Sequence, residues 1–169
     1  MPTLVQNKVI VESQREYSQL QQKGFGEKTT HEFVLDLGEA LFLLEKNKLS
    51  AKDLKGKKLT AKSLLSYAEK REKNFYTKFL VFRDLRERGF CVKTGFKFGF
   101  DFRVYPRGQK PGTAHTQWVV HVAVQGEKIG MPGFSRMVRL AGNIRTTLLL
   151  AVVDSENDIN YYQTDRVTP

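Results

Sequence analysis

The chain has 169 residues, of which 40% are apolar and 27% charged, a balance that argues against a disordered or a fibrous protein. Its 28 Lys and Arg against 18 Asp and Glu give a formal net charge of +10. No apolar run approaches the roughly 18 residues that span a bilayer, the first residues lack the pattern of a signal peptide, and a lone Cys91 allows no internal disulfide. We therefore expect a cytoplasmic protein with no membrane partner.

The first half of the chain is predicted to be mainly helical. Residues 8–13 alternate in polarity and indicate a short strand, as does a second stretch before Gly24. A helix is predicted from Thr30, which can cap it, to residues 46–48, whose positive charge suits a helix C-terminus. Its apolar face consists of Phe33, Leu37, Leu41 and Leu44.

Two more helices are predicted before the pattern changes. Thr60 is expected to open one that extends toward Phe75, and the other spans about Lys78 to Arg88 and stops at Gly89. The N-terminal domain is expected to comprise residues 1–88.

Beyond Gly89 the apolar residues recur with the period of two that is typical of strands. FCVKTG, FKFGFDFRVYPRG and QWVVHVAV are predicted strands, and in the second of these Phe96, Phe98, Phe100 and Phe102 alternate with polar residues or glycine. A helix is predicted in MPGFSRMVRLAGNIR, a buried strand in LLLAVVD, a turn in SEND and a last strand in INYYQTDRV. The fold class is α+β, with a mixed α/β C-terminal domain over residues 89–169.

Positive charge is concentrated in one part of the chain. Residues 93–145 hold nine Lys and Arg against Asp101 and Glu127, whereas the tail 146–169 is acidic. Such a basic segment fits a polyanionic partner, because phosphates supply most non-specific nucleic-acid affinity. A solvated basic face without such a role is an equally plausible interpretation of composition alone.

Two side chains near the turn PRGQKPGTAH are candidates for acid/base chemistry. Tyr105 ends a predicted strand, where a tyrosine is most often a packing residue with a wet hydroxyl but can also exchange protons. His115 lies in the turn itself, is not needed for a core, and is a natural general acid near neutral pH. His31 is more simply a capping or solvent residue, and His121 a structural or surface residue.

A metal site or a nucleotide loop is hard to build from this sequence. Divalent-metal nucleases need clustered carboxylates, and Asp101 with Glu127 forms only a weak imitation of such a motif. GFKFGF lies in a predicted strand and not in a strand-to-helix turn. We therefore expect no metal and no cofactor, and metal-free acid/base chemistry on a basic surface.

Several stretches, in this order, resemble archaeal tRNA-splicing endonucleases. FKFGFDFRVYPRG resembles the family's KYGADFRLY.RG, and AGNIRTTLLLAVVDSENDINYY resembles its AHSVRKKLL.AIVD.DGDI.YY. FLVFRDLRERGFCVKTG is similar to YLVY.DLR.RGY.VKTG, and LGEALFLLEKNKL to a helix of the family's first domain. The matches cover most of the chain.

This resemblance implies a restriction-nuclease-like C-terminal sheet and an enzyme that cuts introns from precursor tRNA at a bulge-helix-bulge fold without a metal. The 2′-hydroxyl attacks its own phosphodiester and leaves a 2′,3′-cyclic phosphate and a 5′-hydroxyl. A tyrosine is the general base, a histidine the general acid, and a lysine stabilises the transition state. By motif position these first two roles fall on Tyr105 and His115.

The lysine's position is filled by Thr146, which carries no charge. Losing one preorganised charge donor typically costs on the order of 10²–10³ in rate. Arg145 or another basic group could supply the charge, the chain could be a structural protomer, or the lysine could have been replaced to trap the protein.

The resemblance also implies RNA-binding and assembly residues. Arg139 falls where the family has an arginine that stacks on a flipped-out base, which guanidinium planes do well. Arg107, Arg145 and Arg166 are the further RNA-binding candidates. In the family an acidic loop joins two dimers into a tetramer and C-terminal strands pair edge to edge. The corresponding interface residues here are Asp154, Glu156, Asp158, Tyr161 and Tyr162.

The sequence thus predicts a subunit of a tRNA-splicing endonuclease that acts on precursor tRNA with a bulge-helix-bulge motif, as a homotetramer or in a heterotetramer with a related subunit. A non-catalytic structural subunit, a plain structured-RNA-binding module and a metal-dependent nuclease are the alternatives.

Overall fold

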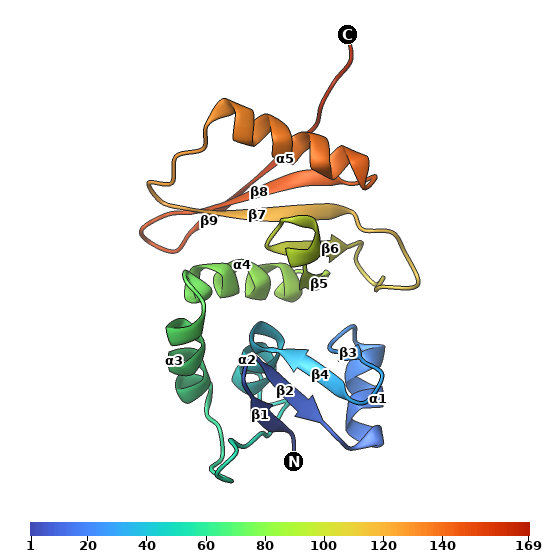
Figure 1. The fold of residues 1–169 in the computed structure, drawn as a ribbon, viewed down its shortest axis with the longest axis vertical. Coiled ribbons are helices and arrows are strands. Elements are labelled where there is room, and N and C mark those ends of the chain that lie inside the picture. Colours follow the sequence, from blue (N-terminus) through green and yellow to red (C-terminus); the bar gives the residue numbers. More distant parts are fainter. The chain divides into compact units, whose positions relative to one another are not determined.

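A computed structural model describes residues 1–169, which divide into two compact units, residues 1–76 and 77–169 (Figure 1). The boundary predicted from the sequence lies between residues 88 and 89, just after helix α4 (Phe75–Glu87), whereas the boundary between these units lies between residues 76 and 77, near the start of that helix. None of the helices is both long and apolar enough to cross a membrane.

Unit 1 is built on a four-stranded antiparallel sheet in the order β1-β2-β4-β3. Its elements are β1 (Thr3–Val5), β2 (Lys8–Val11), α1 (Gln14–Gln22), β3 (Glu27–Lys28), β4 (Phe33–Asp36), α2 (Leu37–Glu45) and α3 (Ala61–Arg71). The strand expected within residues 8–13 is confirmed as β2.

Two expectations for unit 1 are wrong. The stretch before Gly24 is helix α1, capped by the Ser13 hydroxyl, and not a strand. The helix predicted from Thr30 begins only at Leu37, because residues 33–36 form β4 and pair with β2. Strand pairing buries Phe33 and Leu35 on alternate positions and so overrides the helical spacing from Phe33 to Leu37.

Helix α2 starts with a capping box that also fixes a neighbouring loop. The Asp36 carboxylate accepts the Glu39 N–H at 2.7 Å, and the Glu39 carboxylate accepts the N–H groups of Asp36 at 3.2 Å and Gly26 at 3.1 Å. Gly26 has φ +74°, and a Cβ there would lie 2.3 Å from the Phe33 ring. Buried Glu39, 2% exposed, therefore ties α2 to a turn that only glycine can make.

The two later helices are confirmed with shifted ends. Thr60 caps α3 in a second capping box with Ser63. α3 ends at Arg71, and α4 begins at Phe75 and not at Lys78. Asn74, with φ 59°, separates them, so α3 does not continue toward Phe75 as one helix.

Unit 2 is a five-stranded sheet in the order β5-β6-β7-β8-β9. Its strands are β5 (Cys91–Thr94), β6 (Phe102–Tyr105), β7 (Trp118–Val124), β8 (Thr147–Val153) and β9 (Ile159–Thr164), with α5 (Met131–Asn143) between β7 and β8. Only β7 and β8 are parallel, and α5 is the crossover that joins them. α5 covers one face of the sheet and α4 lies on the other (Figure 1).

Each face of this sheet has its own apolar contacts. Phe100, Val119, Ala141 and Leu148 form a buried cluster beneath α5. On the opposite face the Phe82 ring of α4 lies 6.0 Å from the Phe102 ring. The alternation of β6 thus directs Phe102 toward α4 and leaves Arg103 and Tyr105 on the α5 face.

The long aromatic strand expected over residues 96–102 is wrong in its first half. Phe96–Phe98 form a single turn of 3-10 helix, η1, and only Phe102 onward is strand. Gly99 adopts φ 79° and lets the chain fold back, so that the Gly95 N–H bonds to the Asp101 carbonyl at 3.1 Å. Phe96 and Phe98 are consequently exposed, at 59% and 40%.

Replacing Glu39 by alanine should destabilise unit 1 by about 2 kcal/mol, because it leaves the Gly26 N–H without its partner in a buried turn. Urea denaturation of the whole chain, followed by hydrogen exchange at β2 and α2 amides, measures this loss. The matched control is Glu69→Ala, an exposed glutamate of α3. Equal destabilisation by the two substitutions would contradict the role given to Glu39.

Candidate active site

The register of the unit 2 sheet brings three predicted site segments to one end. Val104 pairs with Trp118, and Trp118 pairs with Thr147. One residue beyond this row lie Tyr105, Gln117 and Thr146, and the Gln117 N–H bonds to the Val104 carbonyl at 2.8 Å. Since neighbouring strands are about 4.8 Å apart, Tyr105 and Thr146 are separated by about 10 Å along the row.

His115 is exposed on the loop between β6 and β7, and its ring is tied to the loop that follows α5. Its Nε2 lies 2.9 Å from the Arg145 carbonyl oxygen and 3.2 Å from that of Ile144. A carbonyl can only accept a hydrogen bond, so Nε2 carries the proton and Nδ1 remains for another partner. Arg145 has φ 58°, a left-handed conformation that costs a non-glycine residue roughly 1–2 kcal/mol.

Tyr105 is 5% exposed, more deeply buried than a simple strand-end tyrosine with a wet hydroxyl. Arg103, two residues earlier on the same face, donates from Nη1 to the Tyr105 hydroxyl oxygen at 3.4 Å. The Arg103 Nε donates to the Thr94 carbonyl at 2.7 Å. The Tyr105 hydroxyl therefore has a cationic neighbour, Arg103, on the same face of β6.

Thr146 places no charge at this end of the sheet. Its N–H bonds to the Ala141 carbonyl at 3.0 Å, and its hydroxyl oxygen is buried without a hydrogen-bond partner. The next residue, Thr147, is also a threonine. The two positions that hold lysine in the family's SVRKK stretch are thus both occupied by uncharged threonine in this chain.

Comparison with known proteins identifies this architecture. Residues 2–65 match the family described as tRNA intron endonuclease, N-terminal domain, and residues 75–161 match tRNA intron endonuclease, catalytic C-terminal domain. The tRNA-splicing endonuclease of Methanothermobacter thermautotrophicus is 39% identical over 146 residues, which are 86% of this chain and 84% of that protein. The chain belongs to the tRNA intron endonuclease family.

Further relatives confirm the resemblance. The tRNA-splicing endonuclease of Thermococcus gammatolerans is 36% identical over 143 residues, 85% of this chain and 83% of that protein. That of Pyrococcus furiosus is 34% identical over 160 residues, 94% of this chain and 91% of that protein. The family matches and the two mixed units also confirm the α+β fold class.

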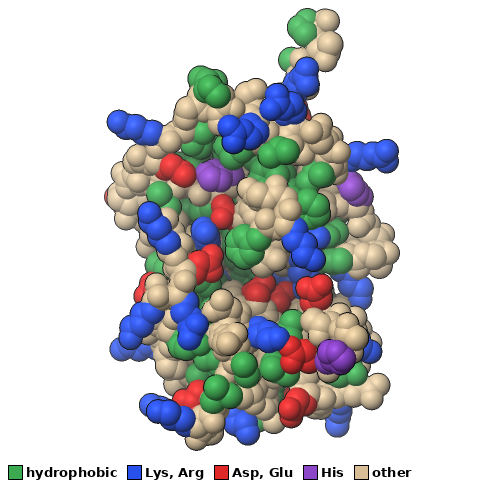
Figure 2. Space-filling model, viewed as in Figure 1, with side chains coloured by type: hydrophobic (Ala, Val, Ile, Leu, Met, Phe, Trp, Pro, Cys, Tyr) green, Lys and Arg blue, Asp and Glu red, His purple; other side chains and the backbone are tan.

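The four arginines expected to bind RNA have different surroundings. Arg139 is exposed on α5, and Arg145 is exposed beside the His115 contact. The Arg107 guanidinium lies 4.8 Å from the centroid of the Phe90 ring. Arg166 follows β9, whose last residue Thr164 pairs with Leu148, so it leaves the sheet at the same end as Thr146. On the face drawn in Figure 2, Lys and Arg side chains are spread over both units.

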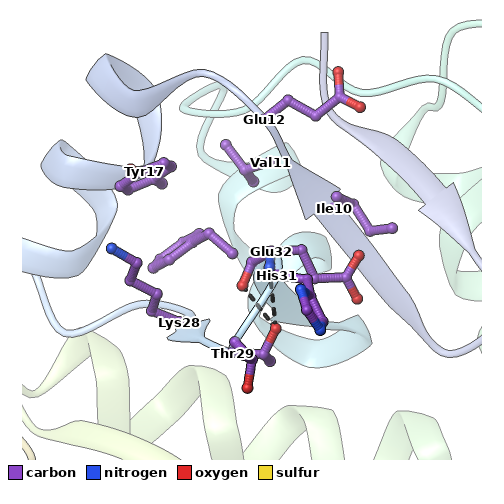
Figure 3. A pocket seen from close by; sticks show the side chains of 10 residues that line it. Ile10, Val11, Glu12, Tyr17, Lys28, Thr29, His31 and Glu32 are labelled. Carbon is purple, nitrogen blue, oxygen red and sulfur yellow. Dashed lines mark hydrogen bonds between the residues drawn. The ribbon is translucent and has the colours of Figure 1, made fainter.

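The other two histidines lie apart from this end of the sheet. His121 Nε2 is 3.4 Å from the Glu127 carboxylate, and its Nδ1 is 3.8 Å from that of Asp101. His31 borders a pocket of about 440 Å³ in unit 1 (Figure 3). There Thr29 bonds to the backbone of Glu32, and the Tyr17 ring stacks on Phe33 at 5.2 Å. No three His, Cys, Asp or Glu side chains of residues 1–169 are grouped to hold a metal ion.

The acidic turn and β9 are partly engaged within the chain. Asp154 accepts the N–H groups of Glu156 at 2.9 Å and Asp158 at 3.0 Å, so its carboxylate shapes the turn, while Glu156 and Asp158 are exposed. Tyr161 faces α4 and donates to the Asp84 carboxylate at 2.6 Å. Tyr162 is 56% exposed, and β9 is an edge strand of the sheet.

Sequence reasoning missed the groups that surround these residues. Arg103 could have been found, because residues two apart on a strand share a face. The contact of Asp84 with Tyr161 carries no local signal, since 77 residues separate them, although the 2.8 Å pair of Asp84 with Arg88 has helical i,i+4 spacing.

Tyr161 should make the free energy of unfolding depend on pH above 10. Burial and the hydrogen bond to Asp84 raise the pKa of Tyr161 in the folded chain. The unfolded chain releases this proton near pH 10 while the folded chain keeps it, so stability falls with rising pH by up to about 1.4 kcal/mol per unit. Tyr161→Phe should lack this component of the slope in urea denaturation series.

Tyr162→Phe, at the exposed neighbouring position, is the control and should keep the wild-type slope. If the free energies of unfolding of wild type and Tyr161→Phe fell in parallel with rising pH, the Asp84 contact would not hold the proton of the Tyr161 hydroxyl.

Proposed function

We propose that this chain is a subunit of a tRNA-splicing endonuclease that cleaves precursor tRNA at bulge-helix-bulge sites without a metal ion. Family membership supports a role in tRNA intron cleavage. The observation that carries the finer proposal is the pair of contacts from the His115 ring to the Ile144 and Arg145 carbonyls. They support an oriented histidine at the same sheet end as Tyr105.

The proposed reaction is an internal transesterification. The ribose 2′-oxygen forms a bond to the adjacent phosphorus while the bond from phosphorus to the 5′-oxygen breaks. Tyr105, as general base, takes the proton of the 2′-hydroxyl, and His115, as general acid, gives one to the leaving 5′-oxygen. The products are a 2′,3′-cyclic phosphate and a 5′-hydroxyl, and no water is consumed.

The orientation of His115 decides which of its nitrogens can act. Nε2 donates to the backbone carbonyls, so in the charged ring the proton on Nδ1 is the one available to the leaving oxygen.

RNA binding is proposed for the arginines around this end of the sheet. Arg139 and Arg145 are exposed and suit stacking on splayed bases or contact with phosphates. Arg107 and Arg166 are further phosphate contacts, although Arg107 already lies over Phe90.

Assembly into a homotetramer or a heterotetramer is part of the proposal. Exposed Glu156 and Asp158 suit a basic pocket on another subunit, and complementary charge would fix the register of that contact. The free edge of β9 with exposed Tyr162 suits edge-to-edge pairing with a second copy or a related subunit.

A second candidate function is a non-catalytic structural subunit. It is favoured by one observation, the uncharged Thr146 and Thr147 at the lysine stretch. Such a chain would bind RNA and support assembly while a related subunit supplies the chemistry.

Cleavage of an end-labelled bulge-helix-bulge RNA in EDTA tests the proposal. Wild type should cut at the bulges and leave cyclic phosphate ends, identified by mass spectrometry, and should spare a bulge-free duplex. His115→Ala should slow cleavage by about 10²–10⁴, the usual contribution of a general acid. His121→Ala, which removes a histidine held by Glu127 and Asp101, is the matched control and should cleave like wild type.

The outcomes separate the candidates. Unchanged cleavage in His115→Ala would contradict the assignment of the acid. No cleavage by wild type, with tight binding to the same RNA and activity only after a related subunit is added, would establish the structural subunit. Activity lost in EDTA would establish a metal-dependent nuclease.

A further inference from the structure

Arg103 is a half-buried arginine whose guanidinium is fixed by three parts of unit 2. Its Nε donates to the Thr94 carbonyl of β5 at 2.7 Å, and its Nη1 donates to the Tyr105 hydroxyl at 3.4 Å. The guanidinium also lies 5.7 Å from the centroid of the Phe98 ring of η1. A side chain held from three sides loses little further freedom on binding a ligand.

No carboxylate neutralises this guanidinium. Arg103 forms no ion pair in residues 1–169, and the nearby Asp101 is engaged by Lys78 at 3.3 Å and by the Val122 N–H at 2.8 Å. Charged groups removed from water are normally paired. Of the five guanidinium N–H donors, the chain uses two. The remaining donors suit an anion, and a phosphate accepts them in a bidentate manner.

Arg103 places its positive charge beside Tyr105, on the β5 side of β6, and not at the Thr146 position two strands away. Arg103 and Tyr105 share the α5 face of β6, and the pairing of Arg103 with Val119, and of Val119 with Leu148, puts Arg103 two residues inward from Thr146, which precedes β8. When the 2′-hydroxyl of a ribose contacts the Tyr105 oxygen, the phosphate attached to that ribose therefore lies near the Arg103 guanidinium.

We propose that Arg103 supplies, in this chain, the positive charge on the scissile phosphate that Thr146 cannot supply. This inference rests on the proposed function. As the 2′-oxygen bonds to phosphorus, negative charge builds up on the two non-bridging oxygens, and Arg103 donates N–H bonds to them. The guanidinium keeps its protons throughout, so the proton balance remains with Tyr105 and His115.

The exposed Phe98 acts in this proposal as a positioning residue. Its ring, 40% exposed, lies 5.7 Å from the guanidinium and supports it without competing for its donors.

The test is single-turnover cleavage of bulge-helix-bulge RNA in EDTA by wild type, Arg103→Gln, Thr146→Lys and the double variant. Arg103→Gln should lower the single-turnover rate constant at saturating enzyme by about 10²–10³, the usual cost of one charge donor. The double variant, with Thr146→Lys added to Arg103→Gln, should cleave at least tenfold faster than Arg103→Gln alone, because a lysine brings back the charge. Arg103→Lys should retain part of the rate.

The matched control is Arg71→Gln, which removes an arginine that lies 4.5 Å from the Tyr67 ring in unit 1. It should cleave like wild type. The proposal would be overturned if Arg103→Gln cleaved within about threefold of the wild-type rate, or if it needed more enzyme for half-saturation at an unchanged maximal rate constant. Circular dichroism of each variant identifies any loss of fold, and Arg103→Lys then carries the test.

A binding measurement keeps this inference separable from the proposed function. Arg103→Gln should reduce the salt dependence of RNA affinity by about one phosphate contact, a change of roughly 0.7–0.9 in the slope of log K against log salt, whereas Arg71→Gln should not. If neither wild type nor Thr146→Lys cleaves, the proposed function fails, and the salt slope of Arg103→Gln alone decides whether Arg103 contacts a phosphate. A slope equal to that of wild type would overturn the Arg103 proposal.

Discussion

The contact on which this end of the protein depends joins the His115 ring to the backbone carbonyls of Ile144 and Arg145. It connects the loop between β6 and β7 with the loop between α5 and β8, at the point where parallel strands β7 and β8 both begin. Arg145 adopts a left-handed conformation there, and its carbonyl accepts the shorter of the two contacts. A strained backbone residue is thus held by the histidine that the proposed chemistry requires.

The sheet topology makes this contact available. Parallel strands need a crossover, and helix α5 supplies it while packing on Val119 and Leu148. Because β6 runs antiparallel to β7, its C-terminal residue Tyr105 arrives at the end where β7 and β8 start. The candidate residues Tyr105, His115 and Arg145 therefore come from one strand end and two loops at the same end of the sheet.

Much of the fold could be predicted from the sequence, and the failures have physical causes. Strands β7 and β8 are nearly continuous apolar runs, and Thr60 marks its helix by a capping box, so local patterns suffice. The period of two over Phe96–Phe102 predicted a strand, but Gly99 turns the chain back and forms η1. For the site, motif resemblance singled out Tyr105 and His115 as candidates. The contacts of His115 span 29 and 30 residues and depend on register that no local pattern specifies.

The most direct test of the account is the protonation of the His115 ring in the intact chain, measured by proton–nitrogen correlation NMR with ¹⁵N-labelled histidine. Donation to two carbonyls predicts that the ring, in its neutral form, carries its proton on Nε2, slowed in exchange with water, and leaves Nδ1 unprotonated. His121, held between two carboxylates, provides an internal reference in the same spectrum. A His115 ring with its proton on Nδ1, or one that averages freely between both forms, would contradict the contact from which the site has been built.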